Sequence, residues 1–261
     1  MYNDSMYKVL FPEANNDYIK EATAQLADTC EAVLEESDLQ TAAVKILDGN
    51  ADAMIAGIDY SSRDVILTAK NIIGMAPGRQ TFSSLFVAKF PDGRRIIISD
   101  GATCKNPTSD QLVDIVELTH DAAAKILGEE PRIAMLSFST FGSGGHDPSM
   151  DKISETLTTI RERHPDYLID GEMQLDAAVN PRVGEKKSAE RGGSAVAGQA
   201  NVLIVPDINS GNILYKAIEQ FAGATVAGPI LLGFAKPVSD LSRGSTVEDV
   251  TLTAESLVKL I

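Results

Sequence analysis

The sequence is poor in residues that several common classes of protein need. Its 261 residues include two cysteines and no tryptophan, and aromatic residues make up only 5% of the chain. Cys30 and Cys104 have no CxxC spacing, so neither a disulfide framework nor a zinc site is indicated. We expect both thiols to be buried.

Long apolar runs are also missing. No stretch approaches the roughly 20 apolar residues that a membrane-spanning helix needs. The opening residues, MYNDSMYKVLFPEANND, have neither a basic start nor a long apolar segment, so no signal peptide is indicated. We therefore expect a cytoplasmic protein with no membrane partner.

Positive charge is scarce. The chain has 23 Lys and Arg against 37 Asp and Glu, for a formal net charge of -14. Nucleic-acid binding needs a basic surface that displaces counterions, so this balance argues against a nucleic-acid partner. A small anionic substrate is compatible with it if a few arginines and backbone amides hold the anion locally.

Several catalytic motifs are absent as well. There is no GxSxG nucleophile elbow, no Walker A loop, and no GxGxxG after the first expected strand. His120, His146 and His164 lack metal-ligand spacing. Nothing therefore indicates a serine hydrolase, a nucleoside triphosphatase, a dinucleotide dehydrogenase or a bound metal.

The pattern that is present is an alternation of β-branched apolar runs with segments of helical period. This alternation is typical of an α/β protein with a largely parallel sheet. The segment SLFVAKFPDGRRIIISD predicts a hairpin around Pro91, Asp92 and Gly93, so the sheet should be mixed. Expected strands are YKVLFP, DAMIAG, RRIIISD, RIAMLSFS, VLIVPD and VAGPILL, and expected helices are residues 16–34, 38–47, 109–127, 151–163 and 212–221.

Two helix starts carry the spacing of a capping box. Thr108 with Gln111, and Ser245 with Glu248, each place a hydroxyl three residues before a side chain that can reach back. Residues 180–201 are polar and lack periodicity, which predicts a long loop. Its basic residues are either solvated or positioned to meet the phosphates of a large ligand: Arg182, Lys186, Lys187 and Arg191.

Three strand-to-helix junctions are rich in small polar residues, and ligands of open α/β sheets bind beyond the carboxyl ends of strands. The junction MLSFSTFGSGG offers hydroxyls and backbone amides that suit a phosphate or carbonyl oxygen. In VLIVPDINSGNILYK, Asn212 is either a helix N-cap or a ligand group. In PVSDLSRGSTVED, Ser242 and Arg243 precede a helix, and we expect Asp249 in its second turn, not needed as a cap.

Four segments carry a resemblance to a known family: AMLSFSTFGS, LIDGEMQLDAAVNP, SAVAGQANVLIVPDINSGNILYKAI and GPILLGFAKPVSDLSRGSTVEDV. They resemble consecutive signatures of the phosphate acetyltransferase and phosphate butyryltransferase family. The resemblance implies a two-domain, three-layer α/β/α fold of the isocitrate/isopropylmalate dehydrogenase type, with a mixed, mostly parallel sheet. The expected domains are residues 1–76 with 238–261, a shortened N-terminal domain completed by the C-terminal helix, and residues 77–237.

The resemblance also implies a reaction and a set of residues. Family members interconvert acyl-coenzyme A and phosphate with acyl phosphate and coenzyme A, which is a co-substrate. No cofactor is bound permanently, and family members are commonly homodimers. Ser242 and Arg243 match the family's catalytic pair, and Asp249 matches its downstream aspartate, our candidate base. The implied substrate-binding residues are Ser137, Ser139, Thr140, Asn212, Tyr215 and Lys216.

Some residues depart from the family pattern. Leu67 and Phe141 stand where the family has cations, and the first domain is shorter and lacks a further arginine. Arg63 compensates for Leu67 if that segment is helical. These losses keep open an alternative, a catalytically degenerate homologue that binds acyl phosphate or coenzyme A as a sensor or partner subunit. A purely structural protein is a third interpretation.

Overall fold

The computed structural model describes residues 6–261, which form two compact units. Unit 1 comprises the residues up to Val87 together with Thr225–Ile261, and unit 2 comprises Ala88–Ala224. The domain junctions expected from the sequence, at 76/77 and 237/238, differ from these and stay a prediction.

The sheet of unit 1 is mixed and mostly parallel. Strands β2, β1, β3 and β10 lie side by side in parallel, and β9 pairs antiparallel with β10. The strands are short, and their buried side chains are mainly aliphatic. The predicted α/β class and the mixed sheet are therefore confirmed. The strands are β1 (Lys8–Phe11), β2 (Glu31–Leu34), β3 (Ala53–Ala56), β9 (Thr225–Leu232), β10 (Val238–Asp240) and most of β4 (Ser83–Lys89).

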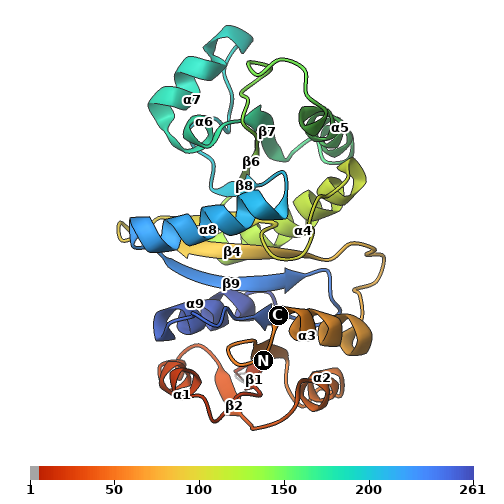
Figure 1. Ribbon diagram of the computed structural model, residues 1–261, viewed down its shortest axis with the longest axis vertical. Helices are drawn as coiled ribbons and strands as arrows, with labels where there is room; N and C mark the ends of the chain where they lie inside the picture. The colour runs from red at the N-terminus through yellow and green to blue at the C-terminus, as the bar shows by residue number, and fades with distance from the viewer. Residues whose placement is uncertain (1–5) are drawn as a thin grey trace, which may run out of the picture. The chain divides into compact units, whose positions relative to one another are not determined.

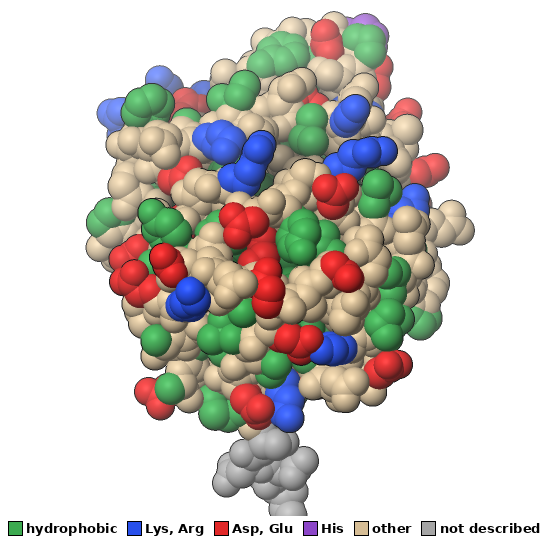
Figure 2. Space-filling view, turned by 60° about the horizontal axis from the view of Figure 1, so that its bottom comes forward, with side chains coloured by type: hydrophobic (Ala, Val, Ile, Leu, Met, Phe, Trp, Pro, Cys, Tyr) green, Lys and Arg blue, Asp and Glu red, His purple; other side chains and the backbone are tan. Residues whose placement is uncertain are grey.

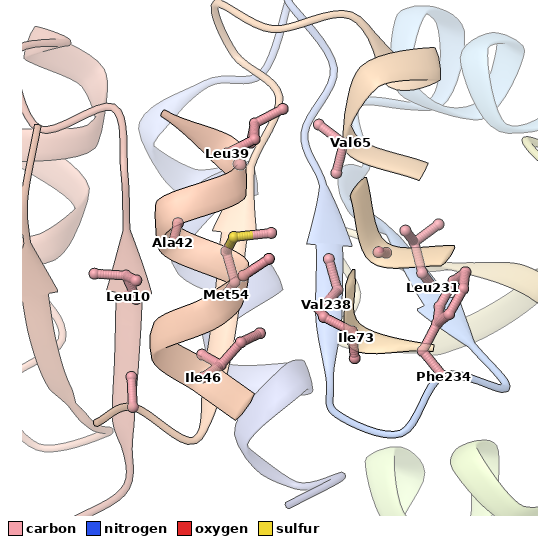
Figure 3. Close-up of a cluster of buried hydrophobic side chains, with 14 residues drawn as sticks. Leu10, Leu39, Ala42, Ile46, Met54, Val65, Ile73, Leu231, Phe234 and Val238 are labelled. Atoms are coloured by element: carbon pink, nitrogen blue, oxygen red, sulfur yellow. The ribbon is translucent and has the colours of Figure 1, made fainter. Parts of the chain in front are cut away.

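Helices cover both faces of the unit 1 strands (Figure 1). Helices α1 (Asp17–Thr23) and α9 (Val247–Val258) pack together, while α2 (Leu39–Leu47) packs on α3 (Ser62–Thr68) and its π-helical continuation η1 (Ala69–Ile73). Figure 3 shows the apolar cluster beneath the second group. It contains Leu10, Met54 and Val238 from the strands.

One helix of unit 1 was predicted too long. Residues 16–34 were expected to be helical, but α1 ends at Thr23 and Glu31–Leu34 forms strand β2. The four residues EAVL pair in parallel with β1. Tertiary pairing overrides the helical propensity of so short a segment, because propensity differences are only fractions of a kcal/mol per residue.

Unit 2 contains a parallel set of strands in the order β5-β8-β6-β7. Helices α4 and α5 pack against each other, as do α6 and α7. The strands are β5 (Arg95–Ser99), β6 (Arg132–Leu136), β7 (Leu168–Met173) and β8 (Val202–Ile204). The helical segments are α4 (Ser109–Leu127), α5 (Pro148–Arg163), α6 (Leu175–Val179), α7 (Pro181–Ser188), η2 (Ala189–Arg191) and α8 (Ile208–Ala222).

The prediction of a loop for residues 180–201 is wrong for half of these residues, because α7 and η2 occupy residues 181–191. Asn180 caps α7 by accepting from the amides of Arg182 and Val183. The buried face of α7 is formed by Gly184 and Ser188. A Cβ on Gly184 would lie 2.3 Å from the backbone nitrogen of Gly198. This face packs through small residues, so the segment shows no apolar periodicity.

Local signals of unit 2 are mostly confirmed. Helix α4 begins and ends as predicted, with the capping box of Thr108 and Gln111. The turn after β4 closes where predicted, with the Gly93 amide donating to the Phe90 carbonyl. Helix α8 begins earlier than expected and is capped by Asp207. Asn212 therefore lies inside the helix, and its interpretation as an N-cap is wrong.

The surface reflects the acidic composition. Figure 2 shows acidic side chains spread over the face that it presents, with basic ones between them. Among residues 6–261, no helix is long and apolar enough to cross a membrane. Cys30 is buried as expected, whereas Cys104 is only partly buried.

Candidate active site

Strand pairing in unit 1 positions Ser242 and Arg243. Strands β3 and β10 run parallel and end together at Ala56 and Asp240. The Leu241 amide donates to the Ala56 carbonyl at 2.6 Å, which continues the ladder one residue past the strand. The next residues leave the sheet at the carboxyl ends of both strands, where ligands of α/β proteins bind.

The Ser242–Arg243 segment, which we define as residues 241–244, is a tight turn. The Ser245 amide donates to the Ser242 carbonyl at 2.9 Å, and the Gly244 amide lies 3.3 Å from Ser242 Oγ. Arg243 is exposed, and its guanidinium has no ion pair or hydrogen bond within the described part of the chain. A cation held at such a turn without an acidic partner is available to an external anion.

Helix α9 begins one residue later than predicted. Its N-cap is Thr246, not Ser245, and its capping-box partner is Asp249, not Glu248. The Asp249 amide donates to Thr246 Oγ1 at 3.2 Å, and Asp249 Oδ2 accepts from the Thr246 amide at 2.8 Å. Ser245 with Glu248 matches the S/T-x-x-E/Q pattern, whereas Thr246 with Asp249 places an aspartate at the last position. Burial decides between them, because this register turns Asp249 inward and leaves Glu248 exposed.

Asp249 is therefore a structural anchor as well as the candidate base. It is 4% exposed, and its Oδ1 accepts from the Val226 amide of β9 at 3.0 Å. The Thr246 hydroxyl lies 2.9 Å from Asp249 Oδ2. Because Thr246 is exposed, its hydroxyl connects this buried carboxylate to the surface.

Replacing Asp249 by asparagine should lower the free energy of unfolding by about 1–3 kcal/mol, because the amide nitrogen cannot accept from the backbone donors that the carboxylate satisfies. Urea unfolding followed by circular dichroism measures the change. The matched control is Glu248→Gln, which removes the neighbouring exposed acid and should change stability by about 0.5 kcal/mol or less. Equal losses in both variants would contradict the observed cap.

Two further acids of unit 1 are buried near this segment. Glu13 is 5% exposed and accepts from the amides of Gly57, Asp59 and Tyr60, at 2.9, 2.6 and 3.1 Å. Burial raises the pKa of Glu13, and these backbone hydrogen bonds oppose the rise. Glu13 thus fixes the segment that follows β3.

Asp240, the last residue of β10, is 1% exposed, and neither of its carboxyl oxygens has a hydrogen bond. Burial raises its pKa to about 7, and the nearby carboxyl of Glu13 adds to the rise, while the Ser62 hydroxyl lowers it. A buried carboxyl group without partners is uncommon and marks a functional-site candidate when it lies beside a ligand-binding edge.

In unit 2, the loop after β6 is organised around Glu172. A register shift in β7 pairs Met135 with Gly171 and Leu136 with Met173, so Glu172 is the bulged residue. Bulges re-aim side chains. Here Glu172 Oε1 accepts from Ser139 Oγ at 2.8 Å and from the Gly142 amide at 2.7 Å.

The amides of this loop are already engaged. The Thr140 amide donates to Ser143 Oγ, and the Gly144 amide donates to Ser139 Oγ. The Phe141 amide donates to the Glu172 carbonyl. A phosphate would therefore compete with hydroxyl and carbonyl oxygens for these amides, and with the Glu172 carboxylate for the Gly142 amide. The sequence pattern does not indicate this competition.

A pocket of about 840 Å³ lies beside this loop. Phe141 contributes to it from a left-handed backbone conformation with φ of 52°, and the Arg191 guanidinium lies 4.1 Å from the centre of its ring. The Arg191 guanidinium also forms an ion pair with Asp170, with 3.3 Å between Nη1 and Oδ1. The lining is Thr140, Phe141, Gly142, Ser143, Gly171, Glu172, Lys186, Lys187, Glu190 and Arg191. Three of the four predicted basic residues thus line this pocket, whereas Arg182 lines another pocket, of about 640 Å³, with Lys186 and Lys187.

The remaining predicted substrate-binding residues lie elsewhere in unit 2. Ser137 and Ser139 belong to the loop after β6 but do not line the pocket. Asn212, Tyr215 and Lys216 lie on α8 and do not line it either. Tyr215 is buried, and the exposed Lys216 amino group lies 4.9 Å from the centre of its ring.

In unit 1, Leu67 lines a separate pocket of about 380 Å³ with Asp38, Tyr60 and Asp64. Arg63 lies one turn earlier on α3 and is exposed, but it does not line this pocket. Within residues 6–261, no cluster of three or more His, Cys, Asp or Glu has the arrangement of a metal site.

The sequence interpretation missed Glu13, Asp240, Thr246 and Glu172. Asp240 and Glu172 had only a weak signal: each is an acid at or next to the end of a strand, and of the two only Asp240 is buried. Glu13 and Thr246 had none beyond their residue type.

Comparison with known proteins identifies the family to which this chain belongs. The family described as phosphate acetyl/butaryl transferase matches residues 13–255. Two curated relatives are the phosphate acetyltransferases of Treponema pallidum and Clostridium acetobutylicum, each 42% identical over 81% of this chain. The chain spans 64% of the length of each relative.

Solved structures agree with this match. A phosphotransacetylase from Streptococcus pyogenes has a TM-score of 0.84 at 30% identity, covering 99% of this chain and 94% of that one. A 4-hydroxythreonine-4-phosphate dehydrogenase from Klebsiella pneumoniae shares the fold alone, with a TM-score of 0.54, 10% identity, and coverage of 98% and 97% of the two chains.

Proposed function

Because the chain belongs to the phosphate acetyl/butaryl transferase family, we propose that it transfers an acyl group, namely acetyl, between coenzyme A and inorganic phosphate. The observation that carries this proposal is the unpaired guanidinium of Arg243 at the carboxyl ends of β3 and β10. Relatives of this name at 42% identity support acetyl as the acyl group.

Arg243 and Ser242 act on the phosphoryl group in this proposal. The planar fork of the guanidinium matches two phosphate oxygens and offsets the negative charge that grows on them as the acyl–oxygen bond breaks. Ser242 Oγ donates to the carbonyl or phosphate oxygen. No covalent acyl-enzyme is needed, since the thiol of coenzyme A attacks the acyl carbon directly.

The thiol proton needs an acceptor. Free thiols have a pKa near about 8.5, so a positioned carboxylate assists the attack by taking the proton. We assign this role to Asp249, which receives the proton by way of the Thr246 hydroxyl, 2.9 Å from its Oδ2. As the carbon–sulfur bond forms and the acyl–oxygen bond breaks, the proton passes on to the departing phosphate.

The pocket of unit 2 suits the phosphates of coenzyme A. Lys186, Lys187 and Arg191 line it, and Phe141 offers an aromatic face. Its volume falls in the ordinary range for small-molecule sites. Coenzyme A is a co-substrate in this proposal, with no permanently bound cofactor. Ser137, Ser139, Thr140 and, from α8, Asn212, Tyr215 and Lys216 stay proposed substrate-binding residues. We also propose that the protein is cytoplasmic and forms a homodimer.

The direct test mixes the purified chain with acetyl phosphate and coenzyme A and follows thioester absorbance. Turnover is expected with acetyl phosphate and, more slowly, with butyryl phosphate. Stabilisation of the protein by either substrate without thioester formation would instead favour the degenerate, ligand-sensing homologue that Leu67 and Phe141 suggest. Neither turnover nor stabilisation would exclude both functions.

A further inference from the structure

The buried carboxyl of Asp240 has no use in the mechanism above, yet it lies three residues before Arg243. Both of its oxygens are sealed from solvent and lack a hydrogen bond of good geometry, although the Ser62 hydroxyl is close enough to lower the pKa of Asp240. Three residues span at most about 10 Å, and an arginine side chain is long, so the separation along the chain permits the guanidinium to approach this carboxyl if the segment rearranges.

The backbone around Asp240 is fitted closely to it. Gly57 lies against its side chain, and a Cβ at Gly57 would overlap Asp240 Oδ1 and lie 2.7 Å from the Leu241 nitrogen. Gly57 also has φ of +116°, which residues with side chains rarely adopt. Glu13 holds the Gly57 amide at 2.9 Å. The carboxyl of Asp240 is thus enclosed by backbone and by a second acid.

Such an enclosure tolerates the protonated carboxyl better than the ionised one. An ionised carboxylate without donors in a buried site is strongly disfavoured, and it gains stability by drawing in a cation or a hydrogen-bond donor. The pKa of about 7 that burial gives Asp240 places this change of charge in the physiological range. Arg243 is the nearest cation in sequence that has no partner in the described chain.

Among the other charged groups nearby, the acids cannot pair with Asp240, and Arg63 is a second candidate cation. Glu13 and Asp249 are acids already bound by backbone amides. Arg63 lies in the first turn of α3 beside Ser62 and is exposed, as Arg243 is; Arg243 is favoured because it lies on the same segment, three residues after Asp240. The titratable or charged groups on segments packed against β10 are Glu13 after β1, Asp59 and Tyr60 after β3, Arg63 and Asp64 on α3, and Glu248, Asp249 and Glu255 on α9.

We propose that Asp240 is a positioning residue of the Ser242–Arg243 segment: its protonated form leaves Arg243 free for an anion, and its ionised form competes with that anion for Arg243. This inference rests on the proposed function in assigning the anion site to Arg243. By linkage, an anion bound to Arg243 and the proton on Asp240 then favour each other.

Sulfate is the probe for the test, because it keeps its double charge over the pH range in which phosphate titrates. Its affinity is measured by isothermal titration calorimetry between about pH 6 and pH 8.5, a range that includes the pKa of about 7 of Asp240. In the unaltered chain the affinity should fall about tenfold across this range, a typical coupling between two sites. In Asp240→Asn the fall should disappear, and in Arg243→Ala affinity should be low throughout.

Matched variants separate the possible sources of a pH effect. Asp28→Asn removes an exposed acid far along the chain and should leave the fall unchanged. Glu13→Gln tests the second buried acid. A fall that survives in Asp240→Asn, or that is lost only in Glu13→Gln, would overturn the proposal. Asp240→Ala serves as a second variant if the asparagine variant does not fold.

The measurement does not require turnover, so the two proposals fail separately. Sulfate binding with the expected pH dependence in a chain that forms no thioester would retain the role of Asp240 and reject the enzyme. Turnover whose KM for acetyl phosphate has the same pH dependence in the unaltered chain and in Asp240→Asn would retain the enzyme and reject the role of Asp240. Absence of any sulfate binding in the unaltered chain would also overturn it.

Discussion

Replacing Arg243 by alanine is expected to lower kcat/KM for acetyl phosphate by about 10²–10³-fold, the usual loss when one donor to a developing oxyanion is removed. The reason is the isolation of this cation. Its guanidinium is exposed and has no partner among the described residues, so it stabilises no neighbour that its removal would disturb. Where Asp240 is protonated, the effect should therefore appear in activity and not in stability.

The measurement compares steady-state thioester formation with unfolding curves for each variant. Arg243→Lys keeps the charge but loses the planar fork, so it should recover only part of the activity. Arg94→Ala is the matched control, because Arg94 is an exposed arginine in the turn after β4 that pairs with Asp92 at 2.7 Å. An Arg243→Ala variant as active as Arg94→Ala would remove the basis of the proposed function.

The second large effect is on stability. Between about pH 4 and pH 8, the titration of Asp240 should lower the free energy of unfolding of the unaltered protein by about 4 kcal/mol. This loss should be absent when Asp240 is replaced by asparagine. The ordinary pKa of 3.8 applies in the unfolded chain, and burial raises it to about 7 in the folded one. Over this window the folded state holds a proton that the unfolded state has lost, which costs about 1.4 kcal/mol of stability for each pH unit.

The sign follows from which state binds the proton more tightly. Because the pKa is raised on folding, the stabilising contribution is full below about pH 4 and is lost as pH rises to about 7. Asparagine does not titrate, so the variant should gain stability relative to the unaltered chain as pH rises. Urea unfolding at several pH values tests this. Parallel curves for the two proteins would show that Asp240 does not titrate as described.

The departures from the family pattern bear on the alternative function. Leu67 lines a pocket with two acids and a tyrosine, so no cation replaces the expected one there. Phe141 instead has a cation on its ring, because Arg191 from η2 lies 4.1 Å from its centre. We propose that Arg191, 50 positions later in the chain, supplies the charge that the family has at position 141, which would weaken the argument for a degenerate homologue.

Much of the local structure followed from the sequence because short-range signals decide it. Helix α4 has its capping box at Thr108 and ends at Gly128 in a left-handed conformation, so both ends were predictable. Strands β3 and β6 are buried apolar runs with turn residues after them. Segments without such signals failed: β2 forms only by pairing with β1, and α7 packs through glycine and serine.

The sequence by itself determined the α/β class, most of the strands but not β2, β7 or β10, the placement of Ser242 and Arg243 shortly before a helix, and the resemblance to a family. Only the tertiary structure decided that Thr246 and Asp249 form the capping box of α9, and that the Glu172 carboxylate binds the loop after β6. It also decided that Asp240 is buried without a hydrogen bond of good geometry. Chain-local propensities and caps act within a few residues, and the sequence displays them. Burial and hydrogen-bond partners depend on which distant segments pack together, and that is known only once the sheet has formed.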